Sequence, residues 1–83
     1  MRFKGIIWLK DIVEKLERKH SVTTFEVTEV MDAARRFRYV EDGDSEGEDL
    51  YAVQGQTDAG RYLTVFFIHK LTGQALIISA RDI

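Results

Sequence analysis

The spacing of apolar residues changes near residue 36, and this change restricts the fold more than any other feature of the sequence. Between residues 8 and 34 the apolar side chains recur every three or four positions, which is typical of amphipathic helices. Between residues 37 and 80 they alternate with polar side chains or form short continuous runs, which is typical of strands. The sequence therefore predicts an α+β domain in which two N-terminal helices pack on a mainly antiparallel sheet.

Both helices are expected before this change, after a short strand within residues 3–8. The first should span residues 8–20, with Lys, Glu and Arg side chains opposite its apolar stripe. Thr23 and Glu26 match a capping box, in which the hydroxyl and the carboxylate each accept an otherwise unpaired backbone N–H. The second helix should therefore begin at this position.

Four strands are expected after the helices, at residues 37–40, 50–56, 61–69 and 74–80. Residues 57–60 and 70–73 have the composition and length of hairpin turns, so the last three strands should form a meander. The nearly continuous apolar run at residues 63–68 predicts a central strand that is covered on both faces. The element order is thus strand, helix, helix and four strands, in a single domain over residues 1–83.

The chain has 83 residues and no cysteine, which limits both its stability and its chemistry. It can form no disulfide, no cysteine-based zinc site and no thiol nucleophile. The apolar run that follows the N-terminus is too short for a signal peptide or a membrane span. We therefore expect a soluble, cytoplasmic protein that is not attached to a membrane.

Acidic side chains are concentrated in one predicted loop. Six of the fourteen acidic residues lie within residues 41–49, although the net charge of the whole chain is only −2. Outside this loop the chain has twelve basic side chains and eight acidic ones. A domain with this distribution can present a basic surface to an anion such as RNA, although the acidic run also fits an ordinary solvated loop.

The sequence has no motif for a metal ion, a nucleotide cofactor or a nucleophilic serine. Basic and polar residues remain at the ends of predicted elements: His20, Arg61, Ser79 and Arg81. RNA cleavage needs a group that accepts the 2′-hydroxyl proton, one that protonates the leaving oxygen, and cations beside the phosphate. These residue types meet those needs, and His20 is the side chain best suited to proton transfer near neutral pH.

Each of these residues also has a structural interpretation. His20 is placed to interact with the C-terminal dipole of a helix, and Arg61 and Arg81 are placed as ordinary charges at the edge of a sheet. Aromatic side chains can stack on RNA bases, but most of those in this chain are better explained as core residues. Tyr39 and Tyr62 lie beside arginines and are the exceptions.

An ordered set of short motifs resembles the BrnT-type toxin family. These toxins have a RelE-like fold and act as ribonucleases of type II toxin–antitoxin pairs, in which a ribbon-helix-helix antitoxin neutralises them. The motifs are Trp8, Lys19-His20-x-Val22, Glu26 and Glu29-Val30, Gly47-Glu48, Tyr51 and Gly55, Gly60-Arg61, and Ile78-Ser79-Ala80-Arg81.

The resemblance implies roles for five matching residues and a class of substrate. Arg61 and Arg81 would bind the scissile phosphate of an RNA, either free or on the ribosome. His20 or Glu48 would transfer protons, and Ser79 would act beside Arg81 in the last motif. No cofactor is implied.

The chain departs from the family pattern in its first helix. The family often has acidic, basic and amide side chains where this sequence has Leu9, Ile12 and Leu16. This difference favours an alternative hypothesis, a non-catalytic protein- or RNA-binding module on the same scaffold. A further alternative is a homodimer that assembles through an uncovered strand rich in Phe.

Overall fold

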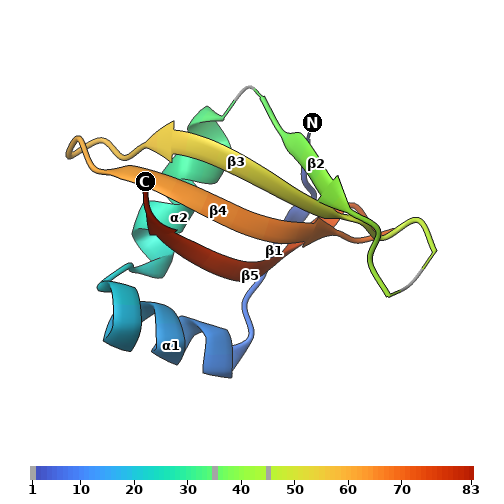
Figure 1. The fold of residues 1–83 in the computed structure, drawn as a ribbon, viewed down its shortest axis with the longest axis horizontal. Coiled ribbons are helices and arrows are strands. Elements are labelled where there is room, and N and C mark those ends of the chain that lie inside the picture. Colours follow the sequence, from blue (N-terminus) through green and yellow to red (C-terminus); the bar gives the residue numbers. More distant parts are fainter. Residues whose placement is uncertain (1, 35, 45) are drawn as a thin grey trace.

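The computed structural model describes residues 2–34, 36–44 and 46–83, which form two helices and a five-stranded sheet (Figure 1). In chain order the elements are β1 (Gly5–Ile7), α1 (Lys10–His20), α2 (Thr24–Ala33), β2 (Arg38–Glu41), β3 (Leu50–Gln56), β4 (Tyr62–His69) and β5 (Gln74–Asp82). The predicted α+β class is therefore confirmed.

The sheet is mixed and its strand order is β1-β5-β4-β3-β2. The predicted meander is confirmed, because β3, β4 and β5 pair with one another in antiparallel fashion, and β2 adds antiparallel to β3. The strand β1 runs parallel to β5, with Ile6 opposite Ala75. Local turn residues could not predict this parallel pair, because the two strands lie at opposite ends of the chain.

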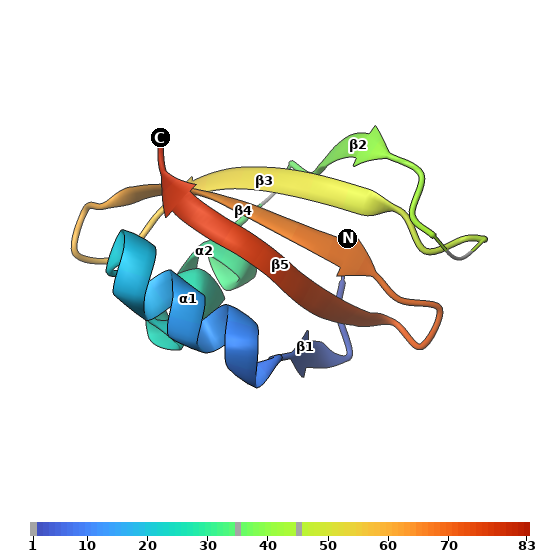
Figure 2. The same cartoon turned by 60° about the horizontal axis from the view of Figure 1, so that its bottom comes forward.

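Both helices cover the same face of the sheet (Figures 1 and 2). The helix α2 packs on β3 and β4, whereas α1 packs on β5. The predicted capping box is present at the start of α2: the backbone N–H of Glu26 donates to the Thr23 hydroxyl, and the backbone N–H of Thr23 donates to the Glu26 carboxylate, each over 3.1 Å. The helix α1 begins two residues later than predicted, because Leu9 has an extended backbone.

The core lies between the helices and the inner face of the sheet. Val27 and Val30 of α2 are fully buried against Leu63, Val65 and Phe67 of β4. Aromatic rings extend this core toward the N-terminal segment, where Phe3 contacts the edges of Phe37 and Phe67 at centroid distances of 5.4 and 5.2 Å.

The prediction that the central strand is covered on both faces was wrong. In β4 the fully buried side chains alternate with side chains on the opposite face of the sheet, where neither helix packs. On this open face Phe66 and Ile68 are half-buried by their neighbours in adjacent strands. An apolar run therefore does not distinguish a doubly covered strand from one whose second face is a flat platform.

Candidate functional site

Arg61 lies between the two helices and the end of the sheet, and all five of its side-chain N–H groups are used there. The guanidinium donates two hydrogen bonds to Asp82, with Nε–Oδ1 at 2.7 Å and Nη2–Oδ2 at 2.9 Å. It also donates to the main-chain carbonyls of His20 and Ser21, both over 2.7 Å, and to the Glu26 carboxylate over 3.3 Å. Arg61 therefore connects the end of α1, the start of α2 and the end of β5.

This arrangement follows from the unsatisfied groups that helix ends leave. The last carbonyls of a helix have no partner within the helix, and Arg61 supplies two of them with charged donors. The hydrogen bonds and charge of Arg61 hold the pKa of Asp82 below its ordinary value. The pKa of Glu26 is also lowered, first by the backbone N–H of Thr23 and then by Arg61. The network is thus held by ionised side chains at neutral pH.

His20 is brought close to this network. It is the last residue of α1, it is half-buried, and its main-chain carbonyl accepts the hydrogen bond from Arg61. Asp82 follows Arg81 directly in β5. The structure therefore brings three of the predicted residues, His20, Arg61 and Arg81, to one end of the sheet.

Ser79 and Arg81 lie on the open face of the sheet. Their cross-strand partners in β4 are Phe66 and Thr64, and directly opposed residues share a face. A shift of register between β4 and β5 leaves Ile78 without a direct partner in β4. The guanidinium carbon of Arg81 lies 5.1 Å from the centre of the Phe66 ring, within the range of a cation–π contact.

Glu48 lies at the opposite end of β4 from Arg61. Its carboxylate forms an ion pair with Lys70 at 2.8 Å and accepts the backbone N–H of Leu71 at 2.9 Å. These contacts lower the pKa of Glu48, so the side chain is ionised at neutral pH. The eight residues of β4 separate it from Arg61 by about 25 Å. Glu48 and the other four predicted residues therefore do not form a single site.

Two arginines at the other side of the open face were not among the residues predicted for the site. Arg36 and Arg38 line a hollow of about 450 Å³ together with Gln54 and the buried Ala52. In the described part of the chain, neither arginine has an acidic side chain within ion-pair distance. The alternation of Arg36 and Arg38 with aromatic residues in the sequence was the signal that could have identified them.

The strand register aligns Arg38 with Ser79, next to the row that holds Arg81. One row across four strands consists of Arg38, Ala52, Phe66 and Ser79, and the next consists of Gln54, Thr64 and Arg81. Three strand spacings separate the ends of the first row, so β2 and β5 lie about 14 Å apart. The open face thus has a floor of small, aromatic and amide side chains with arginines on both sides.

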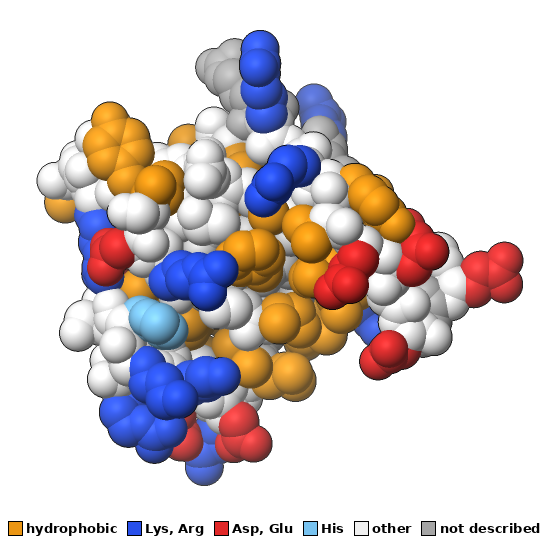
Figure 3. Space-filling model, viewed as in Figure 1, with side chains coloured by type: hydrophobic (Ala, Val, Ile, Leu, Met, Phe, Trp, Pro, Cys, Tyr) orange, Lys and Arg blue, Asp and Glu red, His pale blue; other side chains and the backbone are white. Residues whose placement is uncertain are grey.

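The wider surface has an uneven charge distribution on this face (Figure 3). Basic side chains gather over α1 and the neighbouring end of the sheet, whereas acidic side chains gather over the loop that follows β2, and apolar side chains lie between them.

The two predicted RNA-stacking tyrosines lie on different faces of the sheet. Tyr62 is 58% exposed on the open face, opposite Gln56. Tyr39 faces the other way, opposite Tyr51, and its hydroxyl donates to Asp42, which raises its pKa to about 12.

No model of a protein family matches this chain, and neither a curated protein nor a solved structure matches it. Within the described residues no helix is long and apolar enough to span a membrane. The same residues contain no cluster of three or more His, Asp or Glu side chains that could hold a metal ion.

Proposed function

We propose that this chain is a ribonuclease toxin of the BrnT type, from a type II toxin–antitoxin pair, and that it binds RNA on the open face of its sheet. The observation that carries the proposal is the row Arg38, Ala52, Phe66 and Ser79, with Arg81 beside it. The α+β architecture, with both helices on the opposite face, supports the RelE-like resemblance and leaves this surface free for RNA.

The chemistry of the row suits a single-stranded RNA. Arginine binds phosphate through paired N–H groups, so Arg38 and Arg81 would hold phosphates on either side of the sheet. Single-stranded RNA is commonly held by stacking of its bases on aromatic rings, and the exposed Tyr62 and the half-buried Phe66 provide such rings. Such stacking is tolerant of base identity, because every base has an aromatic face.

Arg81 and His20 are the residues to which we assign the reaction. Arg81 would neutralise the charge that develops on the phosphate, and Ser79 on the same face would help to orient it. His20 would accept the 2′-hydroxyl proton as that oxygen bonds to phosphorus, and a water molecule would protonate the leaving 5′-oxygen as its bond to phosphorus breaks. His20 is placed for this role because Arg61 joins its carbonyl to Asp82, the residue that follows Arg81. Glu48 is too distant to take this role, since it pairs with Lys70 at the other end of β4.

In this proposal Arg61 does not contact the phosphate, and it instead positions the elements that carry the reacting side chains. Its donors are all used by His20, Ser21, Glu26 and Asp82. These contacts fix the end of α1 relative to the end of β5, and so they fix the two elements that carry the reacting side chains. A ribbon-helix-helix antitoxin would neutralise the protein, and the RNA would be free or on the ribosome, as the resemblance implies.

A non-catalytic RNA-binding module is the second candidate, and the first helix favours it. Leu16 is almost completely buried, and Ile12 packs against the core. These positions therefore support the fold in this chain and provide no polar group to the open face. In this alternative the arginines would still bind RNA, but no cleavage would follow.

Growth of a bacterial host after induced expression separates the two candidates. The toxin proposal predicts growth arrest that Arg81→Ala and His20→Asn relieve. Lys10→Ala is the matched control, because it removes one exposed positive charge outside the open face and should leave the arrest unchanged. Normal growth with abundant, folded wild-type protein would contradict the toxin proposal. If that protein still binds single-stranded RNA, the binding module is the correct interpretation.

A further inference from the structure

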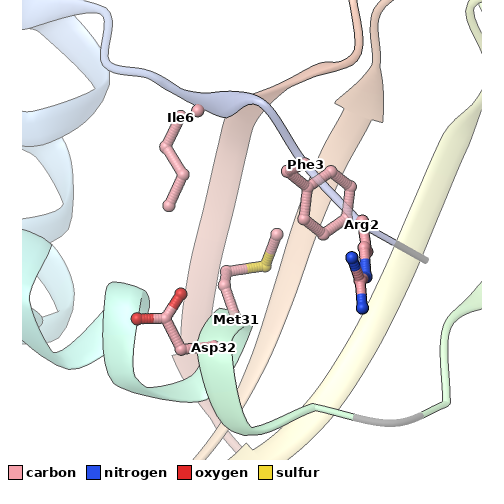
Figure 4. Close-up of a pocket in the computed structure, with 6 residues that line it drawn as sticks. Arg2, Phe3, Ile6, Met31 and Asp32 are labelled. Atoms are coloured by element: carbon pink, nitrogen blue, oxygen red, sulfur yellow. The ribbon is translucent and has the colours of Figure 1, made fainter.

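A groove lies on the helical side of the molecule, apart from the open face of the sheet. It encloses about 300 Å³ between the N-terminal segment and the end of α2, and it is lined by Arg2, Phe3, Gly5, Ile6, Met31 and Asp32. Figure 4 shows Ile6 and Phe3 extending from the N-terminal segment toward α2, with Met31 between the two charged residues. The RNA-binding proposal uses none of these residues.

The side chains of the groove define the chemistry of its ligand. Phe3 and Ile6, which are half-buried, and Met31, which is almost completely buried, form the apolar floor of the groove, and the flexible thioether of methionine adapts to side chains of different shape. Arg2 and Asp32 are exposed and lie on opposite sides of Met31. Neither forms an ion pair with another side chain in the described part of the chain. The groove thus has an apolar centre, a cation at one end and an anion at the other.

The backbone beside the groove is suited to an extended segment. The strand β1 forms one end of the sheet and pairs only with β5, so its second edge has no strand neighbour among the described residues. Such an edge can accept an added strand through main-chain hydrogen bonds, while neighbouring pockets select its side chains. Gly5 and Ile6 belong both to β1 and to the groove.

We propose that this groove binds an extended segment of a partner protein, in which one apolar residue lies between a basic and an acidic residue two positions away on either side. Residues two apart in a strand point to the same face, so all three side chains enter the groove together. Arg2 and Asp32 lie on opposite sides of Met31, just as the acidic and basic residues of the segment lie on opposite sides of its apolar residue. The segment runs antiparallel to β1, so its basic residue meets Asp32 and its acidic residue meets Arg2.

The probe is a capped peptide of sequence Lys-Thr-Leu-Thr-Glu, added to the ¹⁵N-labelled full chain at up to millimolar concentration. Amide chemical shifts should change in residues 5–7 and 31–33, and those of β3 and β4 should not change. The reversed peptide, Glu-Thr-Leu-Thr-Lys, has the same composition and charge, and it should bind roughly two- to fivefold more weakly for each mismatched charge pair. A peptide with Ser in place of Leu should not bind.

A charge-exchange variant makes the test specific. Arg2→Glu combined with Asp32→Lys should reverse the preference, so that the reversed peptide binds more tightly. Both residues are exposed, and the dispersion of the amide spectrum reports whether the variant is folded. Any of three results would overturn the proposal: no chemical-shift change confined to the residues of the groove, equal binding of the two peptides, or an unchanged peptide preference in the variant. Shifts of the same amides that depend on protein concentration without peptide would indicate a second copy of the chain and would also overturn it.

Discussion

Replacement of Arg61 by Met should destabilise the protein by about 2–3 kcal/mol, because it removes the connection between both helices and β5. A hydrogen bond from a charged donor typically contributes about 1.5–3 kcal/mol. The Arg61 side chain is 25% exposed, and pairs that face water contribute little, so we count only the two carbonyls at the end of α1 and take no more than the low end of this range, about 1–1.5 kcal/mol, for each. Met retains much of the aliphatic stem. For a domain of this size the melting temperature should fall by roughly 10–20 °C.

Urea unfolding followed by circular dichroism measures this loss, with the wild type and Arg61→Lys as references. Lysine keeps the charge, but its ammonium group cannot reach His20, Ser21 and Asp82 together, so it should restore only a minor part of the stability. A loss of less than about 0.5 kcal/mol for Arg61→Met would refute the reasoning, provided that the slope of the unfolding transition is unchanged. Such a small loss would indicate that water replaces these hydrogen bonds at little cost in free energy.

Three further predictions concern stability and the extent of the site. Asp82 has a lowered pKa in the folded protein, so its contribution to stability is complete above its ordinary pKa of 3.8 and is lost as the pH falls through the folded value. The free energy of unfolding should therefore decrease less between pH 7 and pH 3 in Arg61→Met than in the wild type. Gly55→Ala should lower the free energy of unfolding by roughly 1–3 kcal/mol, because an added Cβ would lie 3.0 Å from a methyl group of α2. Gly5→Ala is the control: its added Cβ meets nothing within 4 Å, so thermal unfolding should be nearly unchanged. Glu48→Gln should leave RNA affinity unchanged in fluorescence anisotropy, and a large change would place Glu48 within the RNA site.

Local signals in the sequence predicted the elements well. The capping box located the start of α2, because both of its hydrogen bonds form within four residues. The turns at residues 57–60 and 70–73 correctly predicted the meander, since a tight turn can only join neighbouring antiparallel strands. The partner of β1 was not predictable in this way, because its register with β5 depends on packing between the two ends of the chain.

The site was less predictable than the fold because its geometry depends on strand register. Arg61 and Arg81 both appeared as basic residues at strand ends, yet one is enclosed by hydrogen bonds and the other lies on Phe66. Arg38 was overlooked because only the pairing of β2 with β3 places it in line with Phe66 and Ser79. Residue type indicated the chemistry, whereas the register determined which residues share a surface.

The most direct test of the proposed RNA surface is the salt dependence of binding to a fluorescent single-stranded RNA. Each phosphate contact on a single strand contributes about 0.7 to the slope of log affinity against log salt concentration. Arg38→Ala and Arg81→Ala should each reduce the slope by about this amount, whereas Lys10→Ala should leave it nearly unchanged. Equal effects of all three substitutions, or no salt-dependent binding by the wild type, would contradict the assignment of RNA binding to the open face of the sheet.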